Sequence, residues 1–434
     1  MRSRKRVVKW MTATLVMCGA LAGCGKQTAK METVKVAPPE AQPAGKTLQF
    51  EPHPQTLSVP GEPGMATRHP KIGGANVASS VIHFLAVIGE GDNSRLALLN
   101  SNDSGDTFEA PVWVSEKGAK FSSHGENSPG LTVTPDILYA AWNQGGDIRV
   151  GRSLSWGGSF EKPVRISDKP EKDYSGYVSI GVAPNGDVYA VWLDTRDREN
   201  GKEVYSLYMA RSKDNGATFG KNARIAAHVC ECCRPNVSFG PNGEVLVFWR
   251  HVYPGNVRDM TVAVSRDNGE TFGAPVRIAE DNWKIEGCPD SGIALARAEG
   301  RVYAAWLTEA SPTLSGVRMT WTDDAGKTWA APVLASQKIL DANYPAMSAA
   351  EDGRVEMVFQ GRNPEKEKGW APTTAFVVEI AKDGALSTPM EIPGIMSAAS
   401  RPTVYATSNG RVFVGWTEMK EGKGTAKYSR GRHM

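Results

Sequence analysis

The sequence lacks a basic patch, and its apolar start lacks the length of a membrane-spanning helix. That apolar stretch, Met11 to Gly23, falls short of the roughly 20 residues that such a helix needs. The whole chain has a formal net charge of +3, and five of its positive charges lie within the first nine residues. Without them the charge is near −2, which excludes the strongly basic surface typical of proteins that bind nucleic acid or anionic lipid. We therefore expect no nucleic-acid partner.

Residues 1–23 have the features of an export signal, because a positive segment precedes the short apolar stretch. The stretch ends in Leu21-Ala22-Gly23-Cys24, which resembles the lipobox of bacterial lipoproteins. The resemblance implies cleavage before Cys24, lipidation of that residue, and an extracytoplasmic protein anchored to a membrane. Since Gly25 follows, a Gram-negative host would sort it to the outer membrane. An ordinary signal peptide with a chance cysteine is the alternative.

Residues 24–45 are rich in Ala, Pro and Lys and have no apolar periodicity. This composition predicts a flexible tether. The remaining segment, 46–434, is longer than the usual single hydrophobic core, and repeat architectures are one way past that limit. We therefore expect one repeat domain over 46–434.

A short repeat, Ser/Thr-x-Asp-x-Gly-x-Thr-Phe/Trp, occurs in this segment. Good copies lie at 101–108, 212–219, 265–272 and 322–329, and a degenerate copy lies at 153–160. The Asp accepts backbone N–H groups, the Gly supplies a positive φ and the aromatic packs on the sheet, so the pattern encodes a turn. It is typical of the Asp-box, or BNR repeat, which is structural and says little about activity.

A second pattern consists of two strand signals joined by a tight turn and closed by an aromatic residue. Examples are 176–192, 235–249 and 291–306, with Asn-Gly or Glu-Gly turns and period-two alternation. Seven such units recur about 50–60 residues apart, and each holds four strand signals. This organisation predicts an all-β protein, a β-propeller of four-stranded blades.

The last unit, 400–434, has only three strand signals, and the run 48–59 could supply its missing outer strand. We therefore predict seven blades, closed by pairing of the N-terminal and C-terminal strands. Six blades are the alternative.

Propeller geometry predicts where a ligand binds. The start of a blade's first strand, the end of its second and the start of its third share one face, and the Asp-box hairpins lie on the other. Candidate residues therefore include those at the starts of first strands: Arg68, Glu231, Arg234, Tyr344 and Arg401.

Several of these segments resemble the sialidase (neuraminidase) superfamily. Arg68-His69-Pro70 resembles its opening Arg-x-Pro motif, and the segments 287–295, 316–329 and 343–359 resemble later blades. The resemblance implies that three arginines bind a sialic-acid carboxylate in bidentate fashion: Arg68, Arg250 and Arg318. It also implies a catalytic group formed by Tyr344 as nucleophile, Glu231 as its activating partner and Asp92 as the proton-handling acid.

Four cysteines of the predicted propeller are expected near one another, because they lie at the starts of two adjacent blades: Cys230, Cys232, Cys233 and Cys288. In an exported protein they predict one or two disulfides. A thiolate site for Cu(I) or Zn is the alternative. We otherwise expect no cofactor.

Three functions stay open. The first is an envelope module that binds a glycan or a protein partner on the arginine-rich face. The second is an exo-α-sialidase-type glycoside hydrolase, and the third is a metal-handling or redox-handling propeller that uses the cysteines.

Overall fold

The computed structural model describes residues 47–62, 64–74, 80–366 and 372–434. The predicted export signal, Cys24 and the predicted tether lie outside the described residues. Within the described ranges, seven antiparallel sheets are present, and the helical elements are two short 3-10 turns, η1 (Gly91–Asn93) and η2 (Pro364–Lys366). None of the helices in this part of the chain is long and apolar enough to span a membrane.

Each sheet is one blade, and its strands follow the chain from the centre outward. The strands of the first three blades are β3 (Thr67–Gly73), β4 (Ile82–Ile88), β5 (Arg95–Ser101) and β6 (Val112–Trp113); β7 (Phe121–Ser122) with β8 (Gly130–Val133), β9 (Leu138–Gln144), β10 (Asp147–Ser153) and β11 (Val164–Arg165); and β12 (Ser175–Val182), β13 (Val188–Glu199), β14 (Lys202–Ser212) and β15 (Ala223–Ala227).

The next three blades have the same order. Their strands are β16 (Asn236–Phe239), β17 (Val245–Tyr253), β18 (Val257–Ser265) and β19 (Val276–Arg277); β20 (Ile293–Ala298), β21 (Arg301–Thr308), β22 (Gly316–Thr322) and β23 (Val333–Leu334); and β24 (Leu340–Ala349), β25 (Val355–Arg362), β26 (Thr374–Ile380) and β27 (Met390–Glu391).

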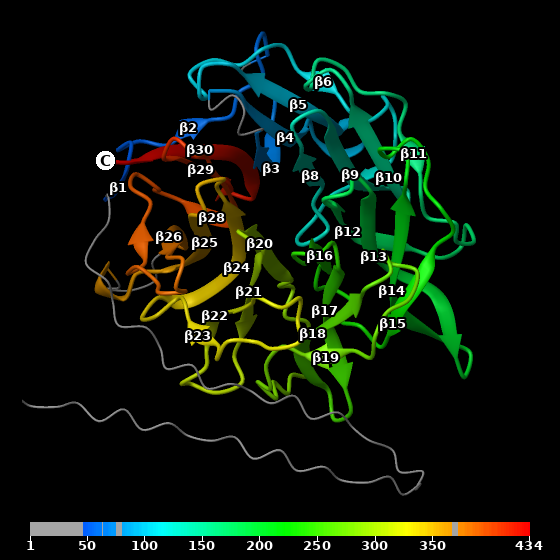
Figure 1. Cartoon of the computed structure of the whole chain (residues 1–434). Helices are drawn as coiled ribbons and strands as arrows, with labels where there is room; N and C mark the ends of the chain where they lie inside the picture. Colours follow the sequence, from blue (N-terminus) through cyan, green and yellow to red (C-terminus); the bar gives the residue numbers. More distant parts are fainter. Residues whose placement is uncertain (1–46, 63, 75–79, 367–371) are drawn as a thin grey trace, which may run out of the picture. The chain divides into compact units, whose positions relative to one another are not determined.

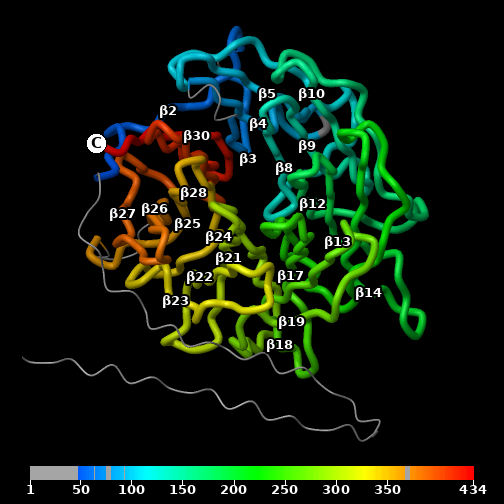
Figure 2. The backbone as a smooth tube through the Cα atoms, in the orientation of Figure 1, coloured from blue at the N-terminus to red at the C-terminus, as the bar shows by residue number. Residues whose placement is uncertain are grey.

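The seventh blade closes the ring with both ends of the propeller. Its strands are β28 (Ala398–Ala406), β29 (Arg411–Lys420), β30 (Lys423–His433), β1 (Leu48–Phe50) and β2 (Gln55–Thr56). Leu48 pairs with His433 and Phe50 with Gly431, so the first described strand completes the last blade. Figure 2 shows these two segments, blue and red, side by side.

The predicted closure and the predicted seven blades are confirmed, and the six-bladed alternative is wrong. Contacts between the inner strands run from β3 through β8, β12, β16, β20 and β24 to β28 and back to β3. Figure 1 shows these strands around the centre of the ring. Gly431 permits the closing contact, because a Cβ there would lie 2.9 Å from the Phe50 ring.

The hydrophobic core lies between neighbouring blades. The second strand of six blades contributes a large aromatic residue that is fully buried: Trp142, Trp192, Trp249, Trp306, Phe359 and Trp416. Burying each of these side chains contributes on the order of 2 kcal/mol or more. The repeated aromatic at the end of each unit therefore joins one blade to the next.

The Asp-boxes form the turns between third and fourth strands. In the third box, Asp267 accepts hydrogen bonds from Thr271 N at 2.9 Å and Ser265 Oγ at 2.7 Å. Gly269 has a φ of 83°, which its lack of a side chain allows. In the degenerate box the hydroxyl of Ser155 replaces the carboxylate and accepts from Ser159 N at 3.0 Å. We call the side with these turns the Asp-box face, and the opposite side the mouth face.

Candidate functional site

The inner strands enclose a channel with a cavity of about 260 Å³. Its walls are mostly apolar along the strands, and its lining is charged near the points where the strands begin. The residues at this charged end are Lys71, Glu126, Arg234, Tyr344 and Arg401. Asp290 joins them through an ion pair with Arg401. We call these six residues the mouth cluster.

Bulges at the starts of four inner strands position residues of this region. The pairing register shifts there in β3, β12, β24 and β28. Each of these strands has a non-glycine residue with a φ between 50° and 59° at a shift, namely His69, Tyr177, Tyr344 and Arg401, and β24 has a second shift at Asp341. Bulges redirect side chains, and left-handed conformations of non-glycine residues are concentrated at functional sites. The backbone thus supports a site at the channel mouth.

Arg401 is the most connected member of the mouth cluster. Its Nη2 lies 2.6 Å from Asp290 Oδ2 and donates to Tyr344 Oη at 3.1 Å. The guanidinium also lies 4.4 Å from the centre of the Tyr344 ring. Among the described residues, its buried Nε has no hydrogen-bond partner.

Arg234 and Glu126 face each other across the mouth without a carboxylate–guanidinium bond. Arg234 Nε donates to the backbone oxygen of Glu126 at 2.8 Å, and Nη2 donates to Ser128 O. The Glu126 carboxylate accepts from Gly292 N at 3.1 Å. Burial raises the pKa of Glu126, although Arg234 and Lys71 oppose the shift. A side chain at 292 is excluded, since its Cβ would lie 2.6 Å from Arg234 O.

Lys71, unlike Arg234, lacks even backbone partners for its charged group among the described residues. Within the described part of the chain, no residue forms an ion pair or hydrogen bond with its Nζ. Burial, followed by the charge of Arg234, lowers the pKa of Lys71 to about 8. Burial also lowers the pKa of His69 to about 3, with Lys71 as the largest electrostatic contributor. The mouth therefore has a positive local potential.

The three arginines that the resemblance assigns to a carboxylate do not line this cavity. Arg68 donates to Gly89 O at 3.0 Å, within the first blade. Arg250 is 1% exposed and donates to the backbone oxygens of Arg258 and Leu307 at 3.0 and 2.9 Å. Arg318 pairs with Asp281. Each guanidinium forms its bonds within its own blade or at the junction with the next blade. The structure does not bring the three together around one pocket.

The predicted catalytic residues are also apart. Tyr344 lies in the mouth cluster, where burial raises its pKa to about 12. Glu231 is 46% exposed by its side chain and lies 3.7 Å from Arg258. Asp92 lies in η1, and its side chain is outside the described atoms. Glu231 does not line the channel cavity.

The sequence analysis missed three members of the mouth cluster: Lys71, Glu126 and Asp290. A usable signal was present for Lys71 and Asp290, because prolines lie at or just before the inner strands. Pro70, Pro235, Pro289, Pro345 and Pro402 each lie within one residue of a cluster member. These prolines indicate five of the six positions, although not the charges that meet there, and no proline adjoins Glu126.

A larger cavity, about 370 Å³, lies on the Asp-box face between the third and fourth blades. Several of its charged groups already form ion pairs. Arg211 lies 2.5 Å from Asp187 and 3.0 Å from Glu270, and Lys213 lies 3.6 Å from Glu270. Lys221, which also lines this cavity, is exposed, whereas the unpaired cation of the channel cavity is partly buried, so the channel cavity is the better candidate site.

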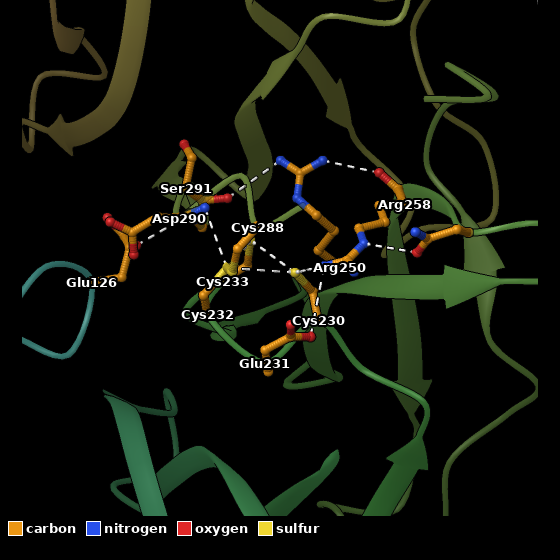
Figure 3. The surroundings of a disulfide bond; sticks show 12 residues. Glu126, Cys230, Glu231, Cys232, Cys233, Arg250, Arg258, Cys288, Asp290 and Ser291 are labelled. Atoms are coloured by element: carbon orange, nitrogen blue, oxygen red, sulfur yellow. Dashed lines mark hydrogen bonds and ion pairs between the residues drawn. A yellow bond between two sulfur atoms is a disulfide. The ribbon is translucent and has the colours of Figure 1, made fainter. Parts of the chain in front are cut away.

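The four cysteines gather beside the mouth (Figure 3). Cys232 and Cys288 form a disulfide, while Cys230 and Cys233 are buried thiols whose sulfurs lie 3.4 Å apart. Arg258 Nη1 donates to Cys230 Sγ at 3.2 Å. The hydrogen bond with Cys233, and then Arg250 and Arg258, lower the pKa of Cys230 to about 6. Burial raises the pKa of Cys233.

The cysteine cluster fits the predicted Cu or Zn site only in a reduced form. The sulfurs of Cys230, Cys232 and Cys288 lie within 4.8 Å of one another. With the disulfide formed, however, only Cys230 and Cys233 remain as thiols. Zinc sites use three or four protein ligands. The disulfide form therefore does not provide a zinc site from these cysteines alone.

Comparison with known proteins agrees with this fold. Residues 157–357 match a family described as a BNR repeat-like domain. No curated protein matches the chain.

Solved structures share the architecture at low identity. A protein of unknown function from Dyadobacter fermentans DSM 18053 is 14% identical, with a TM-score of 0.52 over 89% of this chain and 99% of that chain. Trypanosoma rangeli sialidase in complex with the inhibitor DANA is 14% identical, with a TM-score of 0.47 over 88% of this chain and 59% of that chain. At such identities the likeness concerns the fold alone, so function has to be argued from the site.

Proposed function

We propose that this chain, a sialidase-like propeller built from BNR repeats, is a binding module that holds a carboxylate of its ligand at the channel mouth. The observation that carries the proposal is Lys71, a half-buried cation among Arg234 and Arg401 that has no acidic partner among the described residues. Three cations there face two carboxylates, so a single anionic group would balance the site.

The size of the cavity limits what enters it. At about 260 Å³ it lies below the roughly 300 Å³ at which small-molecule pockets usually begin. It therefore admits one terminal group of a larger ligand. A terminal acidic sugar of a glycan fits this description, and the carboxylate of a protein partner is the second ligand class.

The ammonium of Lys71, which lines the cavity, supplies donors for such a group. Charge-assisted hydrogen bonds to carboxylates are stronger than neutral ones. An anion beside Lys71 would also offset the burial that lowers its pKa. Binding should therefore weaken as the pH rises through about 8, where the free protein loses the Lys71 proton.

Glycoside hydrolysis remains the second candidate, and Tyr344 at the mouth is the observation that favours it. The phenol contacts both Arg401, at 3.1 Å, and the Asp290 carboxylate, and burial raises its pKa to about 12. An activated nucleophile requires a basic neighbour or a lowered pKa. The Asp290 carboxylate is the neighbour available here, but it is already held in an ion pair with Arg401, so binding without turnover is the better supported function.

The module is proposed to act at the cell envelope, where Cys24 anchors it through lipid. Cys24→Ser should move the protein from membranes to a soluble fraction. A wild-type protein that is already soluble would contradict the anchor without affecting the binding proposal.

Calorimetric titration of the purified protein with sialic acid, glucuronic acid and glucose tests the binding function. We expect an acidic sugar to bind, glucose to fail, and Lys71→Met to weaken binding about tenfold or more through loss of one charge contact. Lys213→Met, on the Asp-box face, is the matched control and should bind like wild type. Binding of acidic peptides but not sugars would identify a protein ligand. Folded protein that binds neither class would overturn the proposal.

A further inference from the structure

The cysteine cluster is separate from the channel cavity and has a chemistry of its own. Cys230 and Cys233 are 0% and 1% exposed, whereas Cys288 is exposed. Reagents in solution therefore reach the cluster at Cys288, while the two thiols are shielded.

The sulfur positions connect the buried pair to the exposed residue. Cys230 Sγ lies 3.8 Å from Cys232 Sγ, which is bonded to Cys288, and 3.4 Å from Cys233 Sγ. Arg258 donates to Cys230 Sγ at 3.2 Å, and a donor of this kind favours the thiolate, which is the nucleophile in disulfide exchange. Cys230 thus has a cationic partner and a disulfide within contact distance.

We propose that the four cysteines form a thiol–disulfide relay that carries two electrons from the buried Cys230–Cys233 pair to a disulfide substrate at the surface. The proposal does not depend on ligand binding at the channel mouth. The substrate class is a disulfide, written RSSR, of a small molecule or an exposed protein segment.

The relay begins inside the protein. The Cys230 thiolate attacks Cys232 Sγ, so a Cys230–Cys232 bond forms, the Cys232–Cys288 bond breaks and Cys288 leaves as a thiolate. Cys233, after losing its proton, attacks Cys230 Sγ and releases the Cys232 thiolate. The disulfide has then moved to Cys230–Cys233, and no external oxidant has been consumed.

Two further steps use the substrate. The Cys288 thiolate attacks RSSR, which forms a mixed disulfide and releases one RS⁻. The Cys232 thiolate attacks Cys288 Sγ, which restores the Cys232–Cys288 bond and releases a second RS⁻. Overall, two protein thiols are oxidised to a disulfide, RSSR is reduced to two RSH, and the protons come from Cys230 and Cys233.

Alkylation of the native full-length protein with N-ethylmaleimide tests the internal steps. Samples are quenched in acid, digested without reductant and mapped by mass spectrometry. We expect maleimide on Cys288 together with a Cys230–Cys233 disulfide. Cys288 that stays unlabelled in native protein, or that is labelled without a Cys230–Cys233 bond, would overturn the relay. This measurement needs no variant.

Variants then identify the attacking sulfur. Cys230→Ser should slow Cys288 labelling about tenfold or more, because the internal nucleophile is gone. Lys213→Met, on the Asp-box face and away from the cysteines, is the control and should label like wild type. Melting temperatures check that each variant is folded. Equal labelling of Cys288 in folded Cys230→Ser would contradict the proposed first step.

The substrate steps are tested with dithiobisnitrobenzoate as the disulfide. Native wild type should release two thionitrobenzoate anions per chain and end with both disulfides formed. Cys288→Ser should lose this fast release, since the exposed sulfur is missing. Release that is undiminished in folded Cys288→Ser would show that the reagent reaches the buried thiols directly, and the relay would be wrong.

Discussion

The Asp-box face and the mouth face of this propeller are built in opposite ways. On the Asp-box face, four boxes repeat one set of bonds, and each Asp accepts from the Thr backbone N–H at 2.9 Å. On the mouth face, six of the seven blades contribute one residue each to the mouth cluster. Residues that repeat with the blades stabilise turns, whereas residues that differ at equivalent positions create the site.

The two faces also differ in how readily their ionisable groups stay charged. Hydrogen bonds from Thr271 lower the pKa of Asp267 to about 2, so this exposed carboxylate stays charged. At the mouth, burial lowers the pKa of Lys71 and raises that of Glu126, so both charged forms are disfavoured. The charges on the Asp-box face therefore stabilise the fold, whereas keeping the mouth cluster charged lowers the stability of the fold.

The largest expected effect concerns the disulfide beside the mouth, which spans 56 residues. Replacing Cys232 and Cys288 together by Ser should lower the free energy of unfolding by about 4 kcal/mol, because the unfolded chain loses a loop constraint. Guanidinium unfolding under non-reducing conditions measures it. A change near zero would mean that the blades hold this junction without the bond.

The second prediction concerns the stability cost of the Lys71 charge at the mouth. Lys71→Met should stabilise the free protein by about 1 to 3 kcal/mol below pH 8, because it removes a cation that burial disfavours. The wild-type protein itself should gain stability as the pH rises from about 8 to 10.5, since only the unfolded chain keeps the Lys71 proton there. Urea unfolding against pH measures both effects. A destabilised variant would show that Lys71 has a structural partner.

The third prediction concerns a substitution on the Asp-box face that should destabilise the protein. Asp267→Ala should lower the melting temperature by a few degrees above pH 4, because the turn loses its acceptor, and should leave ligand binding unchanged. A carboxylate with a lowered pKa contributes above its ordinary pKa of 3.8 and loses that contribution as the pH falls to about 2. The difference from wild type should therefore shrink over this interval. A constant difference would assign the effect to lost packing.

The smallest expected effect is that of Tyr344→Phe. The change removes the acceptor of one Arg401 hydrogen bond and leaves the ring contact, so binding should weaken only a few-fold. A fluorogenic sialoside should not be hydrolysed by wild type. Turnover that disappears in the Phe variant would instead establish the hydrolase.

The elements predicted from the sequence are those governed by local rules. Asp267, Gly269 and Thr271 close their turn through bonds within seven residues, so the box predicts its own structure. The strand count predicts that the run 48–59 belongs to the last blade, which lacks a strand, and β1 does pair with β30. The number of strand signals is enough to predict how the ring closes, because a blade that lacks its outer strand would leave an unpaired sheet edge, which is unfavourable.

The site was less predictable because side-chain direction depends on distant partners. Arg250 has the position expected of a ligand-binding arginine, but it donates to Leu307 O in the next blade. The sequence identifies Arg401 only as a residue at the start of a strand, yet a bulge with a φ of 51° brings it to Asp290, 111 positions away. Neither outcome is encoded in the neighbouring sequence.

The sequence by itself determined that the chain is an all-β propeller of seven blades with a cluster of four cysteines, because turns, alternation and unit counting act over short distances. Only the tertiary structure decided which charges meet and which arginines donate to backbone oxygens. It also decided that Cys232 bonds Cys288 while Cys230 and Cys233 remain thiols. The physical reason is that a propeller's centre receives one strand from every blade, so its chemistry is set by residues that are neighbours in space and far apart along the chain.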